Sequence, residues 1–414
     1  MSTDTVPTMP TERETPLDPA PEYARFREES PIARVRFPNG MDGWLVTRFE
    51  EGSQVFSDPR LSANRPDHQS AESFTPAEDQ QAGEDVTGGL GPQNTFVLMD
   101  EPDHGAYRKL LAGRFTPKSI NQKLQPYIDR IVDEHLDALE EKVRTDGSVD
   151  LIEHLALPIP CLVICELLGV PYRDRDGFHG ATEKMMDTAA SGADRTEGLQ
   201  WLVRYITDLV ASKRADPDSE GLLADLVRQS QQEGSVLSDS DLISIGVLLL
   251  FAGHDTTMAM IGLSVLTLLR NPGQWNELRE ERTRIRPAVE ELLRYLTIVQ
   301  FGLGRVATED LELAGAHIAE GDLVVVSMAA ANRDPRVFSD PDALDLDREM
   351  TRHMAFGYGV HQCLGQNVAR AELGTIIPRL IERFPDMRLA VPADEVPMDI
   401  TGTNYGVKRL PVTW

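Results

Sequence analysis

The residue best placed to do chemistry is Cys363, which lies in the string FGYGVHQCLG from Phe356 to Gly365, just before a predicted helix. The unpaired N–H groups and the positive dipole end of a helix N-terminus favour a thiolate, lower the thiol pKa and leave sulfur free to bind a metal. The glycines permit positive φ angles and close approach of a flat ligand to the backbone. Taken alone, a cysteine in a glycine-rich turn is more often a simple buried residue, so other segments must decide.

A second candidate segment, Ala252-Gly253-His254-Asp255-Thr256-Thr257, interrupts a long apolar stretch. Gly253 removes a side chain where something bulky could lie. The Thr256 hydroxyl can bond a backbone carbonyl one turn earlier and open the helix ladder to water. Asp255 supplies an acid beside it, although a threonine pair in a buried helix often does no more than bond its own backbone. His254 is expected to pack the helix or face a solvent channel rather than to bind a metal.

The string around Cys363 resembles the haem-thiolate signature of the cytochrome P450 family, Phe-x-x-Gly-x-x-x-Cys-x-Gly, matched at Phe356, Gly359, Cys363 and Gly365. Three further segments in the family's order and spacing support the resemblance, which covers roughly residues 20 to 414. It implies haem b with Cys363 as the proximal thiolate ligand of the iron. It also implies that Asp255 and Thr256 form the family's catalytic acid–alcohol pair, which supplies protons during oxygen activation. The remaining residues expected to bind the cofactor are His104, Arg108, Ala252, Arg305, Phe356, Gly357, His361 and Gly365.

The pair Glu291 and Arg294 looks like the family's structural Glu-x-x-Arg element, whose ion pair fixes the meander under the haem. On a helix this spacing places both charges on one face, but an exposed pair of this kind would contribute little. The chain departs from the family pattern because Ala343 stands where an arginine commonly completes the set. Arg348 is the expected substitute.

The resemblance implies a haem-dependent monooxygenase that inserts one atom of O2 into an apolar small molecule, by hydroxylation or epoxidation. A polyketide, macrolide, terpenoid or similar secondary metabolite is the expected substrate class. The walls of the substrate site are expected from Leu248, Phe251, Ile298, Phe301, Asn404 and Tyr405, and from the loop 62–95. The alternatives are a peroxide-using or oxidative coupling enzyme of the same haem-thiolate type, and a non-catalytic haem sensor.

The segment 104–128 contains no Asp or Glu, whereas the chain as a whole carries 41 Lys+Arg against 67 Asp+Glu, a net charge of −26. Lys109, Arg114, Lys118 and Lys123 are therefore the expected docking face for an acidic electron donor, a ferredoxin served by its reductase. The alternative is a helical segment whose cations only meet propionates and solvent. The acidic excess argues against nucleic-acid or anionic membrane partners.

The chain of 414 residues is long enough for two or three domains, yet it shows no repeat and no clean linker, which favours one domain over 21–414 after a disordered leader over 1–20. It has no run of 18 apolar residues and no signal-peptide pattern. Its three cysteines show no framework spacing, and Cys161 and Cys165 fit a helix core. A cytoplasmic monomer is expected.

The elements that must position these residues are mainly helical. A capping box at Ser238 and Asp241 opens the longest helix, which ends at Asn271-Pro272; it is apolar nearly all round and must run through the centre of the protein. The fold class is therefore mainly α with small β-sheets, a single-domain cytochrome P450 fold with haem between this helix and the cysteine loop. Other expected elements are helices within 127–143, 151–168, 199–210 and 222–227, a hairpin from 33–37 and 44–47, strands within 305–313 and 323–328, and a final helix from near 363.

Overall fold

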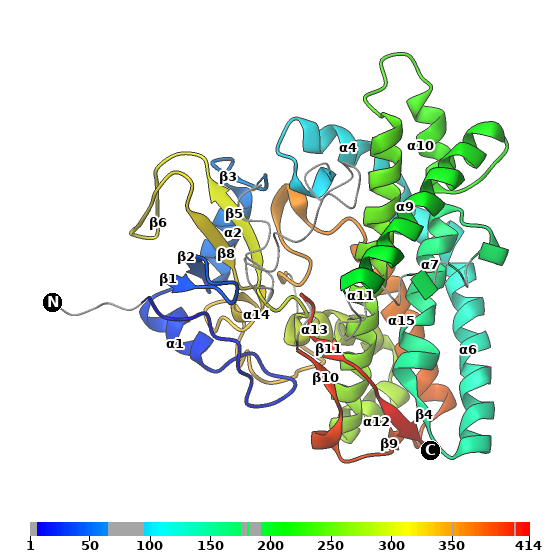
Figure 1. The fold of residues 1–414 in the computed structure, drawn as a ribbon. Coiled ribbons are helices and arrows are strands. Elements are labelled where there is room, and N and C mark those ends of the chain that lie inside the picture. The colour runs from blue at the N-terminus through cyan, green and yellow to red at the C-terminus, as the bar shows by residue number, and fades with distance from the viewer. Residues whose placement is uncertain are drawn as a thin grey trace.

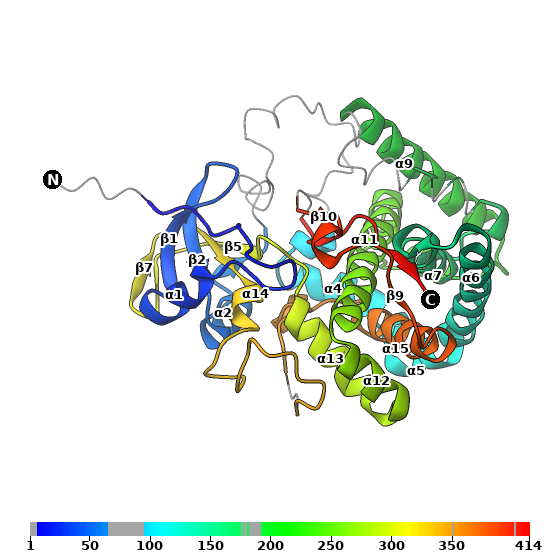
Figure 2. The ribbon, with the colours of Figure 1, turned by 90° about the horizontal axis from the view of Figure 1, so that it is seen from below.

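The computed structural model describes residues 6–64, 95–174, 177, 180–181, 192–349, 352–400 and 403–414. Most of the expected loop over 62–95 lies outside the described residues. Figure 1 shows a small β-rich region around β1, β2, β5 and β8 beside a larger helical region through which α11 passes. The turned view in Figure 2 shows the same division, with α15 and α6 lying close together.

The helices of the described chain follow in order, with short 3-10 and π turns between them. They are α1 (Glu22–Glu29), α2 (Phe49–Ser57), η3 (Phe96–Leu98), α4 (Asp103–Ala112), η4 (Gly113–Phe115), α5 (Pro117–Ser119), η5 (Ile120–Leu124), α6 (Gln125–Asp146), η6 (Ile152–Ala156), α7 (Pro158–Leu168), η7 (Tyr172–Asp174), α9 (Gly192–Ala215), α10 (Leu222–Ser230), α11 (Asp239–Arg270), α12 (Pro272–Glu280), η8 (Arg282–Arg284), α13 (Ile285–Leu296), α14 (Met328–Ala331), η9 (Gly359–His361), α15 (Gln366–Arg383) and η10 (Ala393–Glu395).

The strands within the described residues form four small sheets. Their bounds are β1 (Ile32–Arg36), β2 (Asp42–Val46), β3 (Leu61–Ser62), β4 (Val149–Asp150), β5 (Leu303–Ala307), β6 (Leu311–Leu313), β7 (Ala316–Ile318), β8 (Leu323–Val326), β9 (Arg388–Leu389), β10 (Met398–Asp399), β11 (Gly406–Val407) and β12 (Pro411–Thr413). The largest sheet has the order β1-β2-β8-β5-β3, and the others are β4-β12-β9, β10-β11 and β6-β7.

The expected hairpin is confirmed as the antiparallel pair β1 and β2, in which Ala33 lies opposite Leu45. Gly40 closes its turn with φ 87°, a value that glycine adopts without steric cost. The expected strand over 305–313 is instead two strands, β5 and β6, in different sheets. The polar residues Thr308-Glu309-Asp310 separate them, and Thr308 is tied by its N–H to the carbonyl of Arg60.

The long helix begins as the sequence predicts. The Ser238 hydroxyl accepts the N–H of Asp241 at 3.2 Å, and the Asp241 carboxylate accepts the N–H of Ser238 at 2.7 Å. The helix α11 is long and apolar enough to cross a membrane, but here it packs against α7, α9, α13 and β11 as the central core helix. Cys161 and Cys165 lie buried on α7, one of these neighbours, as expected of core residues.

The N-terminal segment differs from the expected disordered leader over the part that the structure describes, residues 6–20. The Met9 side chain is buried against the large sheet, and its N–H donates to the carbonyl of Arg36 at 2.9 Å. Leu17 is also buried, and the Asp18 carboxylate accepts a hydrogen bond from the Tyr295 hydroxyl. These few apolar and charged anchors offset the ordering entropy of a polar, proline-rich segment.

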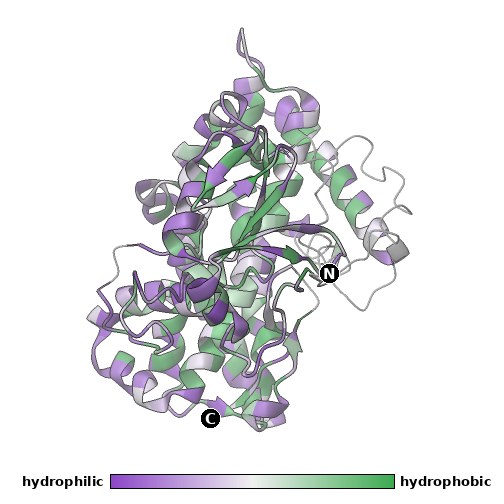
Figure 3. Ribbon diagram, turned by 90° about the vertical axis from the view of Figure 1, so that its left-hand side faces the viewer, coloured by the Kyte–Doolittle hydropathy of each residue, from purple (hydrophilic) through white to green (hydrophobic). Residues whose placement is uncertain are grey.

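The predicted segment 151–168 holds two helical pieces, η6 and α7, divided at Leu157-Pro158 because proline favours the first turn of a helix. The other expected helices lie within α6, α9 and α10. Figure 3 shows hydrophobic and hydrophilic colours side by side on many of the helices, as expected of amphipathic helices that bury one face.

Candidate active site

The cysteine loop is shaped by glycines in the left-handed region. Gly357 and Gly359 have φ angles of 70° and 71°, and a Cβ on Gly359 would come within 2.7 Å of the Phe56 carbonyl oxygen. The Cys363 N–H donates to the Phe356 carbonyl at 2.9 Å, which closes the loop. Helix α15 begins three residues after the cysteine, at Gln366. A Cβ on Gly365 would make an ordinary contact of 3.9 Å with the Cys363 sulfur, so Gly365 leaves that side of the thiol open.

Cys363 is exposed on one side, whereas most of its surroundings are protein atoms. Burial raises the pKa of its thiol, and the N–H groups of Gly365 and Gln366 with the charges of Arg108 and Arg370 lower it in part. The net direction is upward, so the expectation of a helix-lowered thiol pKa is wrong for the protein alone. A cation at the sulfur would add to the partial stabilisation of the thiolate that the helix end supplies.

The acid–alcohol segment lies in the middle of α11. The Thr256 hydroxyl donates to the Ala252 carbonyl at 2.8 Å, as the sequence predicts. Phe251 and Ala252 are exposed on this otherwise buried helix, which leaves an apolar face open. Gly253 does not serve that face, because a Cβ there would meet Ile164 of α7 at 3.2 Å.

The Asp255 carboxylate has a defined partner. The side-chain amide of Asn404 donates to its Oδ2 at 2.6 Å. Burial raises the pKa of Asp255, the bond from Asn404 lowers it, and the charge of Asp399 raises it again, with a net upward shift. A carboxyl group with a raised pKa is suited to release and recover a proton near neutral pH.

Four cationic or ionisable side chains gather beside the cysteine loop, as expected. The rings of His104 and His361 lie 3.9 Å apart, and Arg108 donates a short hydrogen bond to the carbonyl of Gln362. Arg305 is buried and lies over the Phe56 ring with its guanidinium carbon 5.1 Å from the centroid.

This cluster carries more positive than negative character. The pKa of His361 is lowered to about 3 by burial and by the charges of Arg305, His104 and Arg108, against an opposing effect of Asp100. Side chains that disfavour each other's charge at such short range fit an anionic ligand, and paired carboxylates such as the haem propionates match them.

The donor set of the cysteine side also fits haem. In the part of the chain that the structure describes, no group of three His, Cys, Asp or Glu side chains could hold a metal ion. A lone thiolate suits a metal whose other ligands belong to a macrocycle. The residues present therefore fit haem between Cys363 and the open face of α11.

Comparison with known proteins identifies the family. The family model for cytochrome P450 matches residues 196–411. The chain is 40% identical over 401 residues to cytochrome P450-SU2 of Streptomyces griseolus, covering 96% of this chain and 94% of that protein. The chain belongs to the cytochrome P450 family. It is therefore an oxidoreductase, a cytochrome P450 monooxygenase of the actinobacterial type.

Two further relatives show how fully this cytochrome P450 shares the family's length and shape. The 20-oxo-5-O-mycaminosyltylactone 23-monooxygenase of Streptomyces fradiae is 38% identical over 405 residues, covering 98% of this chain and 92% of that protein. The crystal structure of CYP105P1 in complex with filipin I superposes with a TM-score of 0.88 at 38% identity, covering 99% of each chain. The predicted fold class is confirmed.

The structural Glu-x-x-Arg element of this cytochrome P450 is fully buried. Arg294 donates two hydrogen bonds of 2.8 Å to the Glu291 carboxylate and further bonds to the carbonyls of Asn332, Pro341 and Ala343. Arg348 reaches the same carboxylate at 3.1 Å. The meander therefore has its third partner in Arg348, and the backbone carbonyl of Ala343 accepts a hydrogen bond from each of the two arginines.

The structure does not support all of the predicted substrate wall. Phe301 packs into the core of the large sheet, and Ile298 lies in the main core cluster. Tyr405 is buried with Arg13 stacked on its ring, 3.8 Å from the centroid. Their burial depends on packing against residues distant in sequence, which the sequence did not show. Leu248, half-buried, and Phe251, exposed, remain suitable, while Asn404 is engaged by Asp255.

The four cations expected to form the docking face of this P450 differ in exposure and in pairing. Lys109, Lys118 and Lys123 are exposed. Arg114 is half-buried and forms a close ion pair with Asp225 of α10, so its charge is compensated within the protein. Arg114 is therefore wrong as a docking residue, and its partner could not be seen in sequence because it lies 111 residues away.

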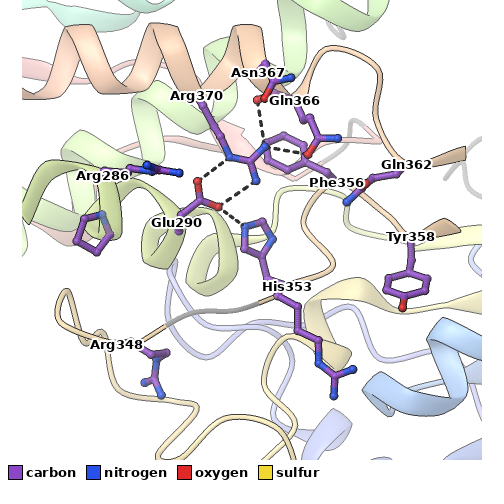
Figure 4. Close-up of a pocket in the computed structure, with 12 residues that line it drawn as sticks. Arg286, Glu290, Arg348, His353, Phe356, Tyr358, Gln362, Gln366, Asn367 and Arg370 are labelled. Atoms are coloured by element: carbon purple, nitrogen blue, oxygen red, sulfur yellow. Dashed lines mark hydrogen bonds and ion pairs between the residues drawn. The ribbon is translucent and has the colours of Figure 1, made fainter. Parts of the chain in front are cut away.

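Sequence reasoning missed a concavity of about 670 Å³ behind the cysteine loop. Figure 4 shows Glu290 at its centre, accepting two hydrogen bonds from Arg370 and facing His353 at 3.0 Å. The Arg370 guanidinium lies over the Phe356 ring, 4.6 Å from the centroid. The other cations on its walls are Arg286, Arg348 and Arg352. The i,i+4 spacing of Gln366 and Arg370 after Cys363 was the available signal for this site.

Proposed function

We propose that this cytochrome P450 hydroxylates or epoxidises an apolar secondary metabolite, with haem b bound by Cys363 and electrons delivered by a ferredoxin and its reductase. One arrangement carries the proposal: an open-sided cysteine before α15 together with Asp255 and Thr256 on α11. Haem, when bound, supplies activation of O2 and insertion of one oxygen atom into the substrate, with the other released as water.

The residues proposed to hold the cofactor contact its two faces and its propionate edge. Cys363 would bind the iron, and Phe356, Gly357 and Gly365 would shape the surface beneath it. The propionates would meet the cation cluster at its edge, and Ala252 would offer a small side chain on the opposite face. The supporting observations are the φ angle of Gly357, the exposure of Ala252 and the depressed pKa of His361. The set proposed for the propionates is His104, Arg108, Arg305 and His361.

Proton supply is proposed to run through Asp255 and Thr256. The hydroxyl of Thr256 donates to the Ala252 carbonyl, so in this turn of α11 a backbone carbonyl accepts a side-chain hydrogen bond in addition to the helical pattern. Water can enter at such a position. The raised pKa of Asp255 lets it give a proton to that water and take one back from solvent.

The proposed substrate class rests on the relatives and on the apolar open face of α11. Their names include pentalenic acid synthase from Streptomyces avermitilis, the S. fradiae macrolide monooxygenase and a structure with filipin I. Phe251 is 47% exposed on α11, a large apolar side chain available to a ligand. A polyketide, macrolide or terpenoid is the proposed class.

The electron donor is proposed to dock at the cysteine side, over Lys109, Lys118 and Lys123. Exposed cations there stand out in a chain with a net charge of −26 and would attract an acidic ferredoxin. We propose a cytoplasmic monomer.

Oxidative coupling is a second candidate. A structural relative, cytochrome P450mel 107F1 with biaryl coupling reactivity, superposes with a TM-score of 0.86 at 33% identity. The two candidates differ in whether oxygen enters the product.

The test is turnover under 18O2 with a [2Fe–2S] ferredoxin, its reductase and NADPH. Filipin I and 20-oxo-5-O-mycaminosyltylactone serve as probes, first for a substrate-induced Soret shift. One 18O atom in a product supports the proposal. Ferredoxin-driven dimer formation without 18O would support coupling, and product formed only with peroxide would overturn the proposed electron route.

A further inference from the structure

The hydrogen bond between Asn404 and Asp255 joins two segments that lie 149 residues apart in sequence. Asp255 belongs to the central helix, and Asn404 precedes the short strand β11. The donor is a neutral amide, which orients a carboxyl group without the strong attraction of a cation. The bond is short, at 2.6 Å, and involves Oδ2 of the carboxyl group.

The segment that carries Asn404 is fixed on several sides. The Tyr405 N–H donates to the Ile298 carbonyl at 2.7 Å, and the Gln300 N–H donates to the Thr403 carbonyl at 3.1 Å. Gly406 packs closely on α11, since a Cβ there would lie 3.3 Å from Ala259. Arg13 stacks on the Tyr405 ring from the N-terminal segment. The amide of Asn404 is therefore held by its backbone in a set place against α11.

The other named electrostatic effects on Asp255 do not stabilise its carboxylate as the bond from Asn404 does. Asp399 of β10 acts on Asp255 by repulsion, and burial also disfavours the carboxylate. Because the amide donates to Oδ2, the proton of the neutral carboxyl group resides on Oδ1. That atom is then the one that can donate toward water beside Thr256.

We propose that Asn404 is a positioning residue that fixes the Asp255 carboxyl group for proton delivery, with Oδ2 bound to the amide and Oδ1 carrying the transferable proton. The inference rests on the proposed function. Each turnover consumes two protons and the two electrons that come from NADPH through the ferredoxin; in each proton transfer Oδ1 releases one proton to water and recovers one from solvent. Asn404 also pairs with Val299 through an isolated β-bridge, which joins the acid to a third segment of the chain.

The experiment compares Asn404→Ala and Asn404→Asp in the holoenzyme. The first removes the amide, and the second keeps its size but loses the donor. Arg13→Ala is the matched control, because it loosens the same segment at Tyr405 without touching Asp255. The readouts are kcat, KM, the solvent deuterium isotope effect on kcat and the urea midpoint of unfolding, the last also in an Asp255→Ala background.

We expect both Asn404 variants to lower kcat about tenfold with an increased solvent isotope effect and an unchanged KM, because a displaced acid slows proton transfer. Arg13→Ala should lower the urea midpoint and leave the isotope effect unchanged. Asn404→Ala should lower the midpoint in the native background and have no effect when Asp255 is alanine.

Equal midpoint shifts in both backgrounds, or an isotope effect that does not change, would overturn the positioning role. The urea cycle needs no turnover, so it separates this inference from the proposed function. Loss of the thiolate spectrum in the native protein would overturn the function while leaving the urea cycle interpretable.

Discussion

The Nε atom of Arg348 donates a 3.1 Å hydrogen bond to Oε2 of Glu291, a carboxylate that is fully buried and also bound by Arg294. Arg348 further donates to the carbonyls of Ser339, Asp340 and Ala343. The Arg348 side chain thus replaces the arginine expected at position 343 and holds the meander through hydrogen bonds to the meander's backbone carbonyls.

Arg348→Met should destabilise the protein strongly. It leaves the Glu291 carboxylate with one cation and frees three meander carbonyls, and breaking a buried ion pair of this kind costs about 3 kcal/mol. Urea unfolding measures this loss in the free energy of unfolding. Arg352→Met is the control, because its ion pair with Glu50 is exposed and should contribute less than about 1 kcal/mol. Equal losses for the two variants would contradict the structural role of Arg348.

Thr256→Ala should divert reducing equivalents into hydrogen peroxide and lower product formed per NADPH about tenfold, because the hydroxyl proposed to hold water is lost. Thr267→Ala is the matched control, since Thr267 donates an equivalent bond to the Leu263 carbonyl on the same helix at 2.7 Å. If both variants keep the native ratio of product to NADPH, Thr256 does not deliver protons.

Arg305→Leu should release haem at least about tenfold faster, because a buried charge-assisted contact with a propionate contributes roughly 1.5–3 kcal/mol. Haem transfer to excess apomyoglobin gives the rate. Arg60→Leu, an exposed arginine just before β3, should leave the rate unchanged. A native transfer rate in Arg305→Leu would remove Arg305 from the propionate set.

Glu290 makes the free energy of unfolding depend on pH in the acid range. Its pKa is lowered to about 2, because hydrogen bonds from His353 and Arg370 outweigh the upward effect of burial. The stabilisation is present above the ordinary pKa of about 4.5 and is lost as pH falls toward 2, by about 2 kcal/mol once its partial exposure is allowed for. Glu290→Gln should flatten urea stability over that window, whereas Glu382→Gln, in an exposed ion pair, should not. An unchanged slope in Glu290→Gln would contradict the assigned contacts.

Lys109→Glu with Lys118→Glu should slow reduction by ferredoxin several-fold at low ionic strength and much less at high ionic strength, as for any screened surface attraction. Stopped-flow reduction measures this. Lys142→Glu on α6 is a control for net charge. Arg114→Glu should act differently: it breaks the pair with Asp225 and lowers stability. A salt-independent rate in the lysine variants would place docking elsewhere.

The parts that the sequence predicted are those encoded locally. Ser238 and Asp241 cap a helix within four residues, and the glycines around Cys363 encode their own loop. The substitution of Arg348 for the expected arginine was also predictable, because both positions lie in one short meander.

The parts that were missed depend on distant packing. Nothing near Asn404 shows that it meets Asp255, and nothing near Arg114 shows Asp225. Residues 7–20 are ordered because Met9 and Leu17 pack into core clusters formed by residues distant in sequence. The thiol pKa was predicted from the helix end alone, whereas burial outweighs that effect.

The central claim is that Cys363 binds haem iron as a thiolate. The most direct measurement is the absorption spectrum of the purified protein after reduction with dithionite and saturation with carbon monoxide. We predict the red-shifted Soret band that is typical of thiolate ligation, and its loss in Cys363→Ser. A globin-like band in the native protein, or a native band retained in Cys363→Ser, would contradict the account.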